Sequence, residues 1–356
     1  MTTPDPSTLI PVTLLTGFLG SGKTTVLNSL VRQPEMARSL IVINEFGQIG
    51  LDHMLVAHSA EDAVVEMSSG CLCCTIRGDL IKTLREAVWR FARGGARQFD
   101  RVLIETTGLA DPAPILNTLM TDPFVAKRYR LDGVICTVDL AAGEATLDAH
   151  PEAVKQVAVA DALLLTKQDL ATEPAVQAMH ERLRRLNPTA SQWPVRQGAV
   201  EPDAVLNLGL FDADGKTADV ARWLRAEAVA QEHAHHHHHH HDVNRHDEHI
   251  RAYAFTLSEP IDATALDTWL DALLSLMGAD MLRMKAVLDV RGEALPVVLH
   301  GVQHRLHPRS SLPAWPGGQR GSQLVFITRD IEREAIEAGF RQAMAAVGAK
   351  TCLIPG

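Results

Sequence analysis

A glycine-rich segment near the N-terminus carries the clearest chemical signature in the chain. Residues 17–24 read Gly-Phe-Leu-Gly-Ser-Gly-Lys-Thr, which matches the phosphate-loop pattern. Glycines let backbone amides turn inward around a β-phosphate, the lysine neutralises the β- and γ-oxygens, and the threonine hydroxyl ligates Mg²⁺. The sequence therefore predicts a nucleotide-phosphate site in one continuous run: Gly17, Phe18, Leu19, Gly20, Ser21, Gly22, Lys23, Thr24 and Thr25.

An acidic residue follows an apolar segment later in the chain. Residues 101–104 read Arg-Val-Leu-Ile and lead into Glu105-Thr-Thr-Gly108. Phosphate-loop proteins hold Mg²⁺ with an acidic residue at the end of a buried strand. We therefore expect Glu105 to hold Mg²⁺ together with Thr24, and the amide of Gly108 to meet a γ-phosphate. Lys23 and Glu105 are our first catalytic candidates.

A third segment favours guanine over adenine. Residues 162–165 are apolar and run into Thr166-Lys-Gln-Asp169. A carboxylate can accept hydrogen bonds from the N1 and 2-amino groups of guanine, which adenine lacks as donors, while a lysine stem packs on the base. We expect Thr166, Lys167 and Asp169 to read the base, so GTP is the predicted nucleotide.

Three cysteines crowd together between these motifs. Cys71, Cys73 and Cys74 follow a glycine, and a disulfide between adjacent cysteines would be strained. Three thiolates can converge on one soft or borderline ion such as Zn²⁺. The alternative is a set of small buried apolar side chains, which we also expect for the isolated Cys136 and Cys352.

Histidines form the other anomaly. Eight of the nine residues 233–241 are histidine, and neutral imidazoles collect Zn²⁺, Ni²⁺, Co²⁺ or Cu²⁺. A flexible string suits capture or buffering of several ions, or it is a low-complexity linker whose metal affinity is incidental. His300, His304 and His307 make a weaker candidate metal cluster, with structural roles as the alternative.

Apolar strands that alternate with helices must position these motifs. Expected strands cover residues 12–15, 40–43, 101–104, 133–138 and 162–165, with helices over 23–32, 80–92 and 154–159 between them. This order predicts a doubly wound α/β domain with a mainly parallel sheet over residues 1–228. Residues 229–249 read as a His-rich flexible linker. Residues 250–356 read as a smaller α+β domain, with strands at 250–257, 281–290, 295–300 and 323–328 and helices at 263–277 and 331–346.

Composition narrows the class of protein. With 46% hydrophobic residues the chain can bury a substantial core, and its formal net charge is -9. No long run of Lys and Arg appears, so nucleic-acid binding driven by phosphate attraction is not expected. No apolar stretch approaches the roughly 18 residues needed to cross a bilayer, and no signal sequence is apparent. We therefore expect a cytoplasmic protein.

Taken together, the motifs resemble those of the CobW-type phosphate-loop GTPases, a family of metal chaperones and metalloenzyme activators. The resemblance rests on Asn44-Glu-Phe-Gly47, Gly70-Cys-Leu-Cys-Cys74, Gly301-Val-Gln-His304 and the three nucleotide motifs, with Glu105 continuing to Pro112. Arg128-Tyr-Arg-Leu-Asp-Gly133 fits one branch of the family best. One departure is Gln48, where many members carry Glu.

The resemblance implies roles for matching positions. Residues 17–25 would bind the phosphates, and Thr24 and Glu105 would hold Mg²⁺. Cys71, Cys73 and Cys74 would hold the transferred metal. Residues 44–52 resemble a first switch loop, and we take Asp52 as the candidate that orients the attacking water. The C-terminal domain would contact a client metalloprotein, and a homodimer across the nucleotide site fits the fold class.

These expectations converge on a GTPase that binds a transition metal, Zn²⁺ first and Co²⁺, Ni²⁺ or Fe²⁺ as alternatives, and delivers it to a client protein. Slow intrinsic hydrolysis is expected because no arginine finger is apparent in the motifs. The rival interpretations are a histidine-rich metal buffer or storage protein, a GTPase activator of a cobalt- or iron-dependent metalloenzyme, and a small-molecule kinase.

Overall fold

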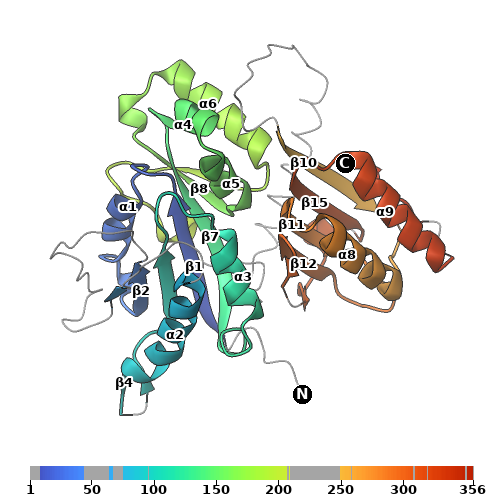
Figure 1. Ribbon diagram of the computed structural model, residues 1–356, viewed down its shortest axis with the longest axis horizontal. Helices are drawn as coiled ribbons and strands as arrows, with labels where there is room; N and C mark the ends of the chain where they lie inside the picture. The colour runs from blue at the N-terminus through green and yellow to red at the C-terminus, as the bar shows by residue number, and fades with distance from the viewer. Residues whose placement is uncertain are drawn as a thin grey trace. The chain divides into compact units, whose positions relative to one another are not determined.

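The computed structural model describes two seven-stranded sheets with their flanking helices, and a short two-stranded sheet (Figure 1). The described residues are 9–43, 64–66, 75–94, 96–206, 208, 249–257, 259–307, 309–318, 320–348 and 351–355.

The N-terminal sheet is parallel throughout, with the strand order β3-β2-β6-β1-β7-β8-β9. Its strands are β1 (Ile10–Gly17), β2 (Ser39–Ile43), β3 (Val64–Glu66), β6 (Arg101–Glu105), β7 (Tyr129–Asp139), β8 (Ala162–Thr166) and β9 (Ser191–Pro194). Consecutive residues along β2 and β8 are all buried, so both faces of the sheet are covered. The predicted doubly wound α/β fold is confirmed.

Helices connect the parallel strands. They are α1 (Lys23–Leu30), α2 (Thr75–Arg90), α3 (Ala113–Thr121), α4 (Gly143–Ala149), α5 (Pro151–Val159) and α6 (Glu173–Leu186). Short 3₁₀ turns lie at η2 (Pro34–Met36), η3 (Gln168–Leu170) and η4 (Pro202–Ala204), and β4 (Ala92–Arg93) pairs with β5 (Ala96–Arg97). On α1, Val26, Leu27 and Leu30 pack into the same core as Leu15 of β1 and Leu164 of β8.

The strand register brings the carboxyl ends of five strands to one edge of the sheet. Leu15 of β1 lies beside Glu105 of β6, and Ile43 of β2 lies on the other side of Glu105. Asp139, the last residue of β7, lies beside Thr166, the last residue of β8. Residues that follow these strands therefore meet at a single edge, where parallel α/β sheets bind their ligands.

A buried carboxylate interrupts the pairing near the opposite end of β7. Between Val12 and Thr13 the register of β1 shifts by one residue, which makes Asp132 the extra residue of a β-bulge. Its two oxygens accept hydrogen bonds from Arg101 Nη1 at 2.9 Å and Arg130 Nη1 at 3.0 Å. Asp132 is 1% exposed, so this charge depends on its arginine partners for compensation.

The C-terminal sheet is antiparallel and has the order β13-β12-β11-β15-β10-β16, with β14 also paired to β12. Its strands are β10 (Ile250–Leu257), β11 (Met281–Leu288), β12 (Val297–Val302), β13 (Arg305–Leu306), β14 (Ser310–Ser311), β15 (Ser322–Arg329) and β16 (Ile354–Pro355). Helices α8 (Ala263–Met277) and α9 (Arg333–Ala346) lie side by side on it (Figure 1), and η6 (Pro316–Gly318) is a short turn.

Aromatic side chains fill the core between these two helices and the sheet. The Trp269 ring of α8 meets Phe340 of α9 edge to face at 4.9 Å and Phe326 of β15 at 6.0 Å. Such contacts add to the free energy gained by burying the rings. At the start of α8, the Asp262 carboxylate accepts hydrogen bonds from two backbone amides. The predicted smaller α+β fold is confirmed.

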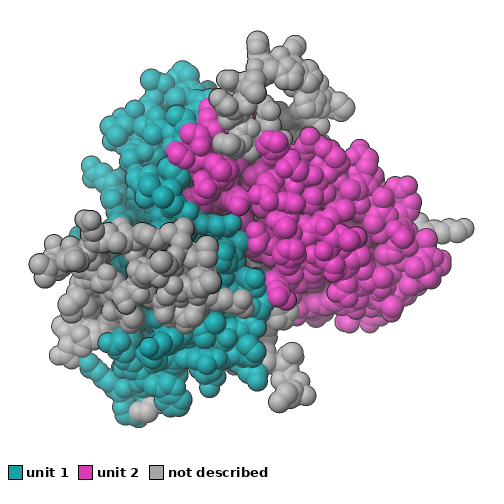
Figure 2. Space-filling model, in the orientation of Figure 1, with its two compact units in different colours: residues 1–146, 160–180, 191–209 teal, residues 147–159, 181–190, 210–356 magenta. Residues whose placement is uncertain are grey.

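The chain divides into two compact units (Figure 2). Unit 1 comprises residues 1–146, 160–180 and 191–209, and unit 2 comprises residues 147–159, 181–190 and 210–356. The domain limits at residues 228 and 249 follow from composition and stay a prediction. Among the helices that the structure describes, none is long and apolar enough to cross a membrane.

Candidate functional site

The turn between β1 and α1 has a backbone that favours glycine. Gly17, Gly20 and Gly22 have φ angles of 140°, 72° and 97°, a region that side chains disfavour. Gly17 also packs closely against β7, since a Cβ built there would lie 2.2 Å from Thr137 Oγ1 and 2.6 Å from its carbonyl oxygen. The glycine spacing of the motif thus follows from the shape of this turn.

Polar contacts fix the turn from inside. Lys23 Nζ donates to the carbonyl oxygens of Gly17 at 2.9 Å and Phe18 at 3.1 Å, which holds the ammonium within the loop. Ser21 Oγ donates to Phe18 O at 2.7 Å and lies 2.6 Å from Thr137 Oγ1. Because Lys23 is buried, its positive charge acts in a region of reduced dielectric, where phosphate attraction is strong.

A hydroxyl and a carboxylate meet beside the loop. Thr24 Oγ1, at the start of α1, donates to Glu105 Oε1 at the end of β6 over 3.1 Å. Glu105 is 6% exposed. Both groups are oxygen donors of the kind that Mg²⁺ prefers, so these residues fit that ion.

Residues 106–108, which follow Glu105, contact both β1 and the phosphate loop. Thr106 donates from its backbone N to Leu15 O and from its Oγ1 to Thr16 Oγ1, both at 2.9 Å. Gly108 touches the phosphate loop so closely that a Cβ there would lie 2.6 Å from Leu19 N. Residues 106–108 therefore form one wall of the space in front of the loop.

A cavity of about 330 Å³ lies between these groups. It opens at the carboxyl edge of the sheet and combines a buried cation, a carboxylate, hydroxyls and glycine amides. Of the residues predicted from sequence, the structure brings eight together here, and it adds three others. The lining residues are Leu19, Gly20, Gly22, Lys23, Thr24, Thr25, Glu105 and Gly108, with Ile43, Thr106 and Thr107.

The predicted base-reading motif lies at the end of β8. Thr166 Oγ1 donates to Ser21 O at 2.7 Å, which ties this motif to the phosphate loop. Lys167 has a left-handed backbone with φ 56°, and its Nζ lies 2.7 Å from Asp139 Oδ2. Asp169 lies on η3 and is exposed. A carboxylate in this position is open to a base.

Two features of this region escaped the sequence analysis. Asp139 ends β7 directly beside Thr166, and the signal that could have found it is the one that found Glu105, an acidic residue at the end of an apolar strand. The turn after β9 carries Gln197 and Gly198 with φ of 50° and 80°. A Cβ on Gly198 would lie 2.6 Å from Thr25 O, so this turn also abuts the start of α1.

The predicted metal residues Cys71, Cys73 and Cys74 lie outside the described residues, as do Asp52 and the histidines at 233–241. What the structure describes are the flanks of the cysteine motif. β3 ends at Glu66, which pairs with Ile43, and α2 begins at residue 75. The cysteine segment therefore starts from the same strand edge as the cavity.

The remaining cysteines and histidines have structural surroundings. Cys136 is buried in β7 as expected, and burial raises the pKa of its thiol to about 12. The expectation for Cys352 is wrong, because this residue is exposed in the short segment before β16. His300 and His307 pack ring against ring at 6.0 Å, whereas His304 Nδ1 is bonded to Leu274 O of α8. Within the described ranges, no three His, Cys, Asp or Glu side chains are grouped to hold a metal.

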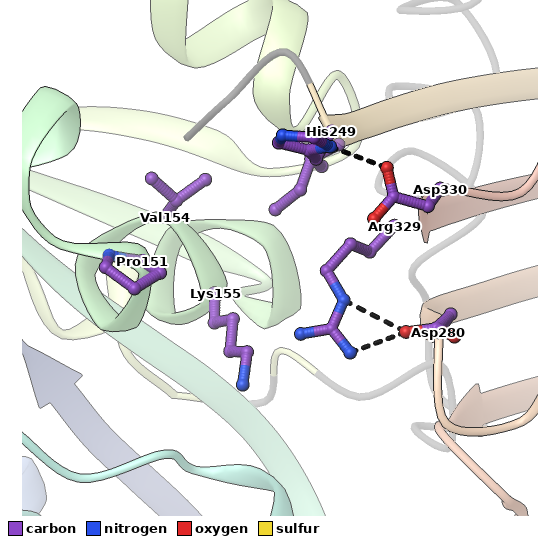
Figure 3. Close-up of a pocket in the computed structure, with 8 residues that line it drawn as sticks. Pro151, Val154, Lys155, His249, Asp280, Arg329 and Asp330 are labelled. Carbon is purple, nitrogen blue, oxygen red and sulfur yellow. Dashed lines mark hydrogen bonds and ion pairs between the residues drawn. The ribbon is translucent and has the colours of Figure 1, made fainter. Parts of the chain in front are cut away.

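A second cavity, of about 380 Å³, lies in unit 2 (Figure 3). His249 Nδ1 and Asp330 Oδ1 lie 2.6 Å apart, and Arg329 Nε donates to Asp280 Oδ1 at 2.9 Å. The two carboxylates in its wall are thus engaged in pairs. The cavity at the phosphate loop, with its buried lysine and glycine amides, is the better candidate for chemistry.

Comparison with known proteins agrees with this geometry. Residues 11–194 match the model of the CobW/HypB/UreG nucleotide-binding domain, and residues 250–344 match that of the cobalamin synthesis protein cobW C-terminal domain. The zinc chaperone YjiA of Escherichia coli K12 is 32% identical over 93% of this chain and 98% of its own. The zinc-regulated GTPase metalloprotein activator 1 of Schizosaccharomyces pombe is 33% identical over 50% of this chain and 44% of its own.

Comparison with a solved structure points to the same family. The Zn(II)-bound YjiA GTPase from E. coli superposes with a TM-score of 0.67 at 29% identity, covering 94% of this chain and 99% of the other. Both domain matches and a relative of nearly full length confirm the resemblance drawn from the motifs. The chain therefore belongs to the CobW/HypB/UreG family of phosphate-loop GTPases.

Proposed function

We propose that this protein is a GTP-hydrolysing zinc chaperone that binds Zn²⁺ at Cys71, Cys73 and Cys74 and delivers it to a client metalloprotein. The observation that carries the proposal is the convergence of Lys23, Thr24 and Glu105 on one cavity at the strand edge from which the cysteine segment starts. The relatives named as zinc chaperones support it.

In this proposal the nucleotide occupies the phosphate-loop cavity. Backbone amides of residues 17–25 surround the phosphates, and Lys23 neutralises the oxygens that gain charge when the γ-phosphoryl group leaves. Gly108 also lines the cavity, and in this proposal its amide meets the γ-phosphate. Thr166, Lys167 and Asp169 hold the guanine, and the Gln197–Gly198 turn flanks it.

Thr24 and Glu105 would hold Mg²⁺. When bound, this ion would supply positive charge that neutralises the phosphate oxygens. The Thr24 hydroxyl donates to the Glu105 carboxylate over 3.1 Å, and both residues line the same cavity as Lys23. Asp52, our candidate for orienting the attacking water, stays a sequence-based prediction.

In this proposal zinc is the ion that is delivered, and the bound nucleotide would control how tightly the three cysteines hold it. The cysteine segment has only eight residues, 67–74, between the last residue of β3 and the first of α2. A short tether to the carboxyl edge lets a change near the γ-phosphate alter the spacing of the three thiolates. GTP would then favour the tight arrangement, and hydrolysis would release the ion.

The test is a Zn²⁺ competition titration against a chromophoric chelator, with Mg²⁺ and either GDP or a non-hydrolysable GTP analogue. We expect zinc affinity to differ at least tenfold between the two states, which corresponds to a coupling free energy of about 1.4 kcal/mol. Equal affinities in both states would contradict nucleotide-controlled delivery.

Variants separate the two halves of the proposal. Cys73→Ser with Cys74→Ser should abolish tight zinc binding and leave GTP binding intact, whereas Cys352→Ser, which alters an exposed cysteine outside the motif, should change neither. Lys23→Ala should weaken GTP binding and preserve a zinc site whose affinity no longer responds to nucleotide. Loss of both zinc binding and GTP binding in the double cysteine variant would indicate a structural role for the motif.

A second candidate function is activation of a metalloenzyme, which the name of the S. pombe relative suggests. It predicts that a client gains activity only with GTP hydrolysis, even when free zinc is saturating. The buffer interpretation predicts instead that deleting residues 234–241 removes most of the bound zinc and leaves no tight site.

A further inference from the structure

Asp139 uses its two carboxylate oxygens for different partners. Oδ1 accepts hydrogen bonds from the backbone amides of Ala141 at 2.8 Å and Ala142 at 3.1 Å, which stabilises the turn before α4. Oδ2 accepts a hydrogen bond from the ammonium of Lys167 at 2.7 Å. The Asp139 side chain is 14% exposed and that of Lys167 is 38% exposed, so this ion pair is only partly screened by water.

The backbone of Lys167 has a strained conformation, which contacts such as the ion pair with Asp139 must stabilise. Its φ and ψ of 56° and 31° place a non-glycine residue in the left-handed region, which costs on the order of 1 kcal/mol. The Lys167 carbonyl accepts a hydrogen bond from Leu170 N at 3.0 Å, which closes η3 around Asp169. Lys167, whose backbone is strained, and Asp169, which is proposed to bind guanine, therefore belong to one short turn.

Two acidic residues lie near the lysine, one in space and one in sequence. Asp139 holds it in the structure, while Asp169 lies two residues along the chain and is exposed. An ammonium released from Asp139 would be attracted to the Asp169 carboxylate, since few other charges of that sign are as near in sequence. A carboxylate paired in this way would be a poorer acceptor for the N1 and 2-amino groups of guanine.

We propose that Asp139 is a positioning residue for guanine recognition: it anchors the Lys167 ammonium, which keeps the lysine stem extended under the base and leaves the Asp169 carboxylate open to guanine. This inference rests on the proposed function, in which Lys167 and Asp169 bind the base. It adds a residue outside the motif that determines base specificity.

The test compares affinities for fluorescent GDP, and for GDP against IDP in competition, since hypoxanthine lacks the 2-amino group. Asp139→Asn keeps Oδ1 for the amides of Ala141 and Ala142 and removes the charge that holds Lys167. We expect GDP affinity to fall about tenfold and the preference for GDP over IDP to shrink severalfold. Asp122→Asn is the matched control, because Asp122 bonds the amides of Phe124 and Val125 at 3.0 Å in the same way, away from the base.

A double-mutant cycle separates positioning from a structural role. Lys167→Met keeps an apolar stem and has no ammonium to misplace, so adding Asp139→Asn to it should cost no further affinity or preference. If Asp139→Asn weakens GDP binding equally in the Lys167→Met background, the residue acts through the turn before α4 and the proposal is wrong. Unchanged GDP affinity in the single variant would also overturn it.

The proposed function fails in a different way. A wild-type chain that bound ADP as tightly as GDP would refute guanine recognition at Asp169, and with it the role of the ion pair. Thermal unfolding of each variant shows whether a loss of affinity reflects a loss of fold. We expect the midpoints of Asp139→Asn and Asp122→Asn to agree within a few degrees.

Discussion

Gly108→Ala tests the closest contact in the nucleotide cavity. A Cβ at this position would lie 2.6 Å from Leu19 N and 2.7 Å from Leu19 Cα, whereas ordinary contacts begin near 3.4 Å. One side must therefore retreat by about 0.8 Å, the difference between the observed and the ordinary contact distance. Thr106 is held by two hydrogen bonds to β1, while Leu19 is 57% exposed at the tip of the phosphate loop. We expect the loop tip to move.

The expected cost follows from overpacking. Inserting a methyl group into a packed contact costs about 1–3 kcal/mol, which corresponds to roughly a 5- to 150-fold loss of affinity. Because the displaced atoms belong to the phosphate loop, GDP and GTP should both bind more weakly. Fluorescent GDP titration with Mg²⁺, followed by competition with a GTP analogue, measures both values.

The control is another glycine-to-alanine change that meets no obstacle. A Cβ on Gly339 in α9 would lie 3.8 Å from its nearest neighbour, and alanine is the better helix former. Gly339→Ala should leave nucleotide affinity unchanged and should not lower stability. GDP affinity within twofold of wild type for Gly108→Ala would refute the reasoning, since it would mean that this wall does not restrain the loop during binding.

Three further predictions concern stability and reactivity. Asp132→Asn should destabilise the N-terminal domain by about 3 kcal/mol, because it removes the buried negative charge that Arg101 and Arg130 share. Urea unfolding measures this, and a loss below about 1 kcal/mol would contradict it. Cys136 should resist alkylation at pH 8 in the native protein while Cys352 reacts, as peptide mapping would show. Burial raises the pKa of the Cys136 thiol from 9.0 to about 12, so above pH 9 the folded state keeps a proton that the unfolded state loses. The free energy of unfolding should therefore fall by up to about 1.4 kcal/mol per pH unit above pH 9. Cys136→Ala should flatten that slope.

Some of the fold was readable from sequence because its signals are local. The phosphate loop is one continuous run, and its glycines reflect backbone angles that each residue adopts by itself. The strands and helices of the C-terminal domain follow periodicities of two and 3.6 residues, and the predicted ranges 250–257 and 263–277 match β10 and α8. Predicted strands such as 133–138 were too short, since β7 begins at Tyr129 and includes the bulge at Asp132.

The sequence alone determined which residue types could do chemistry and that a parallel sheet would carry them. Only the tertiary structure decided which of them meet. Thr24 and Glu105 are 81 residues apart, and they touch because β1 lies directly between β6 and β7. The same strand order brings Asp139 to Lys167, while the hairpin after β12 turns His304 toward α8 and separates it from His300. Local pattern specifies each element, but the order of strands in the sheet is a property of the whole packed chain, so contacts between distant segments emerge only when it folds.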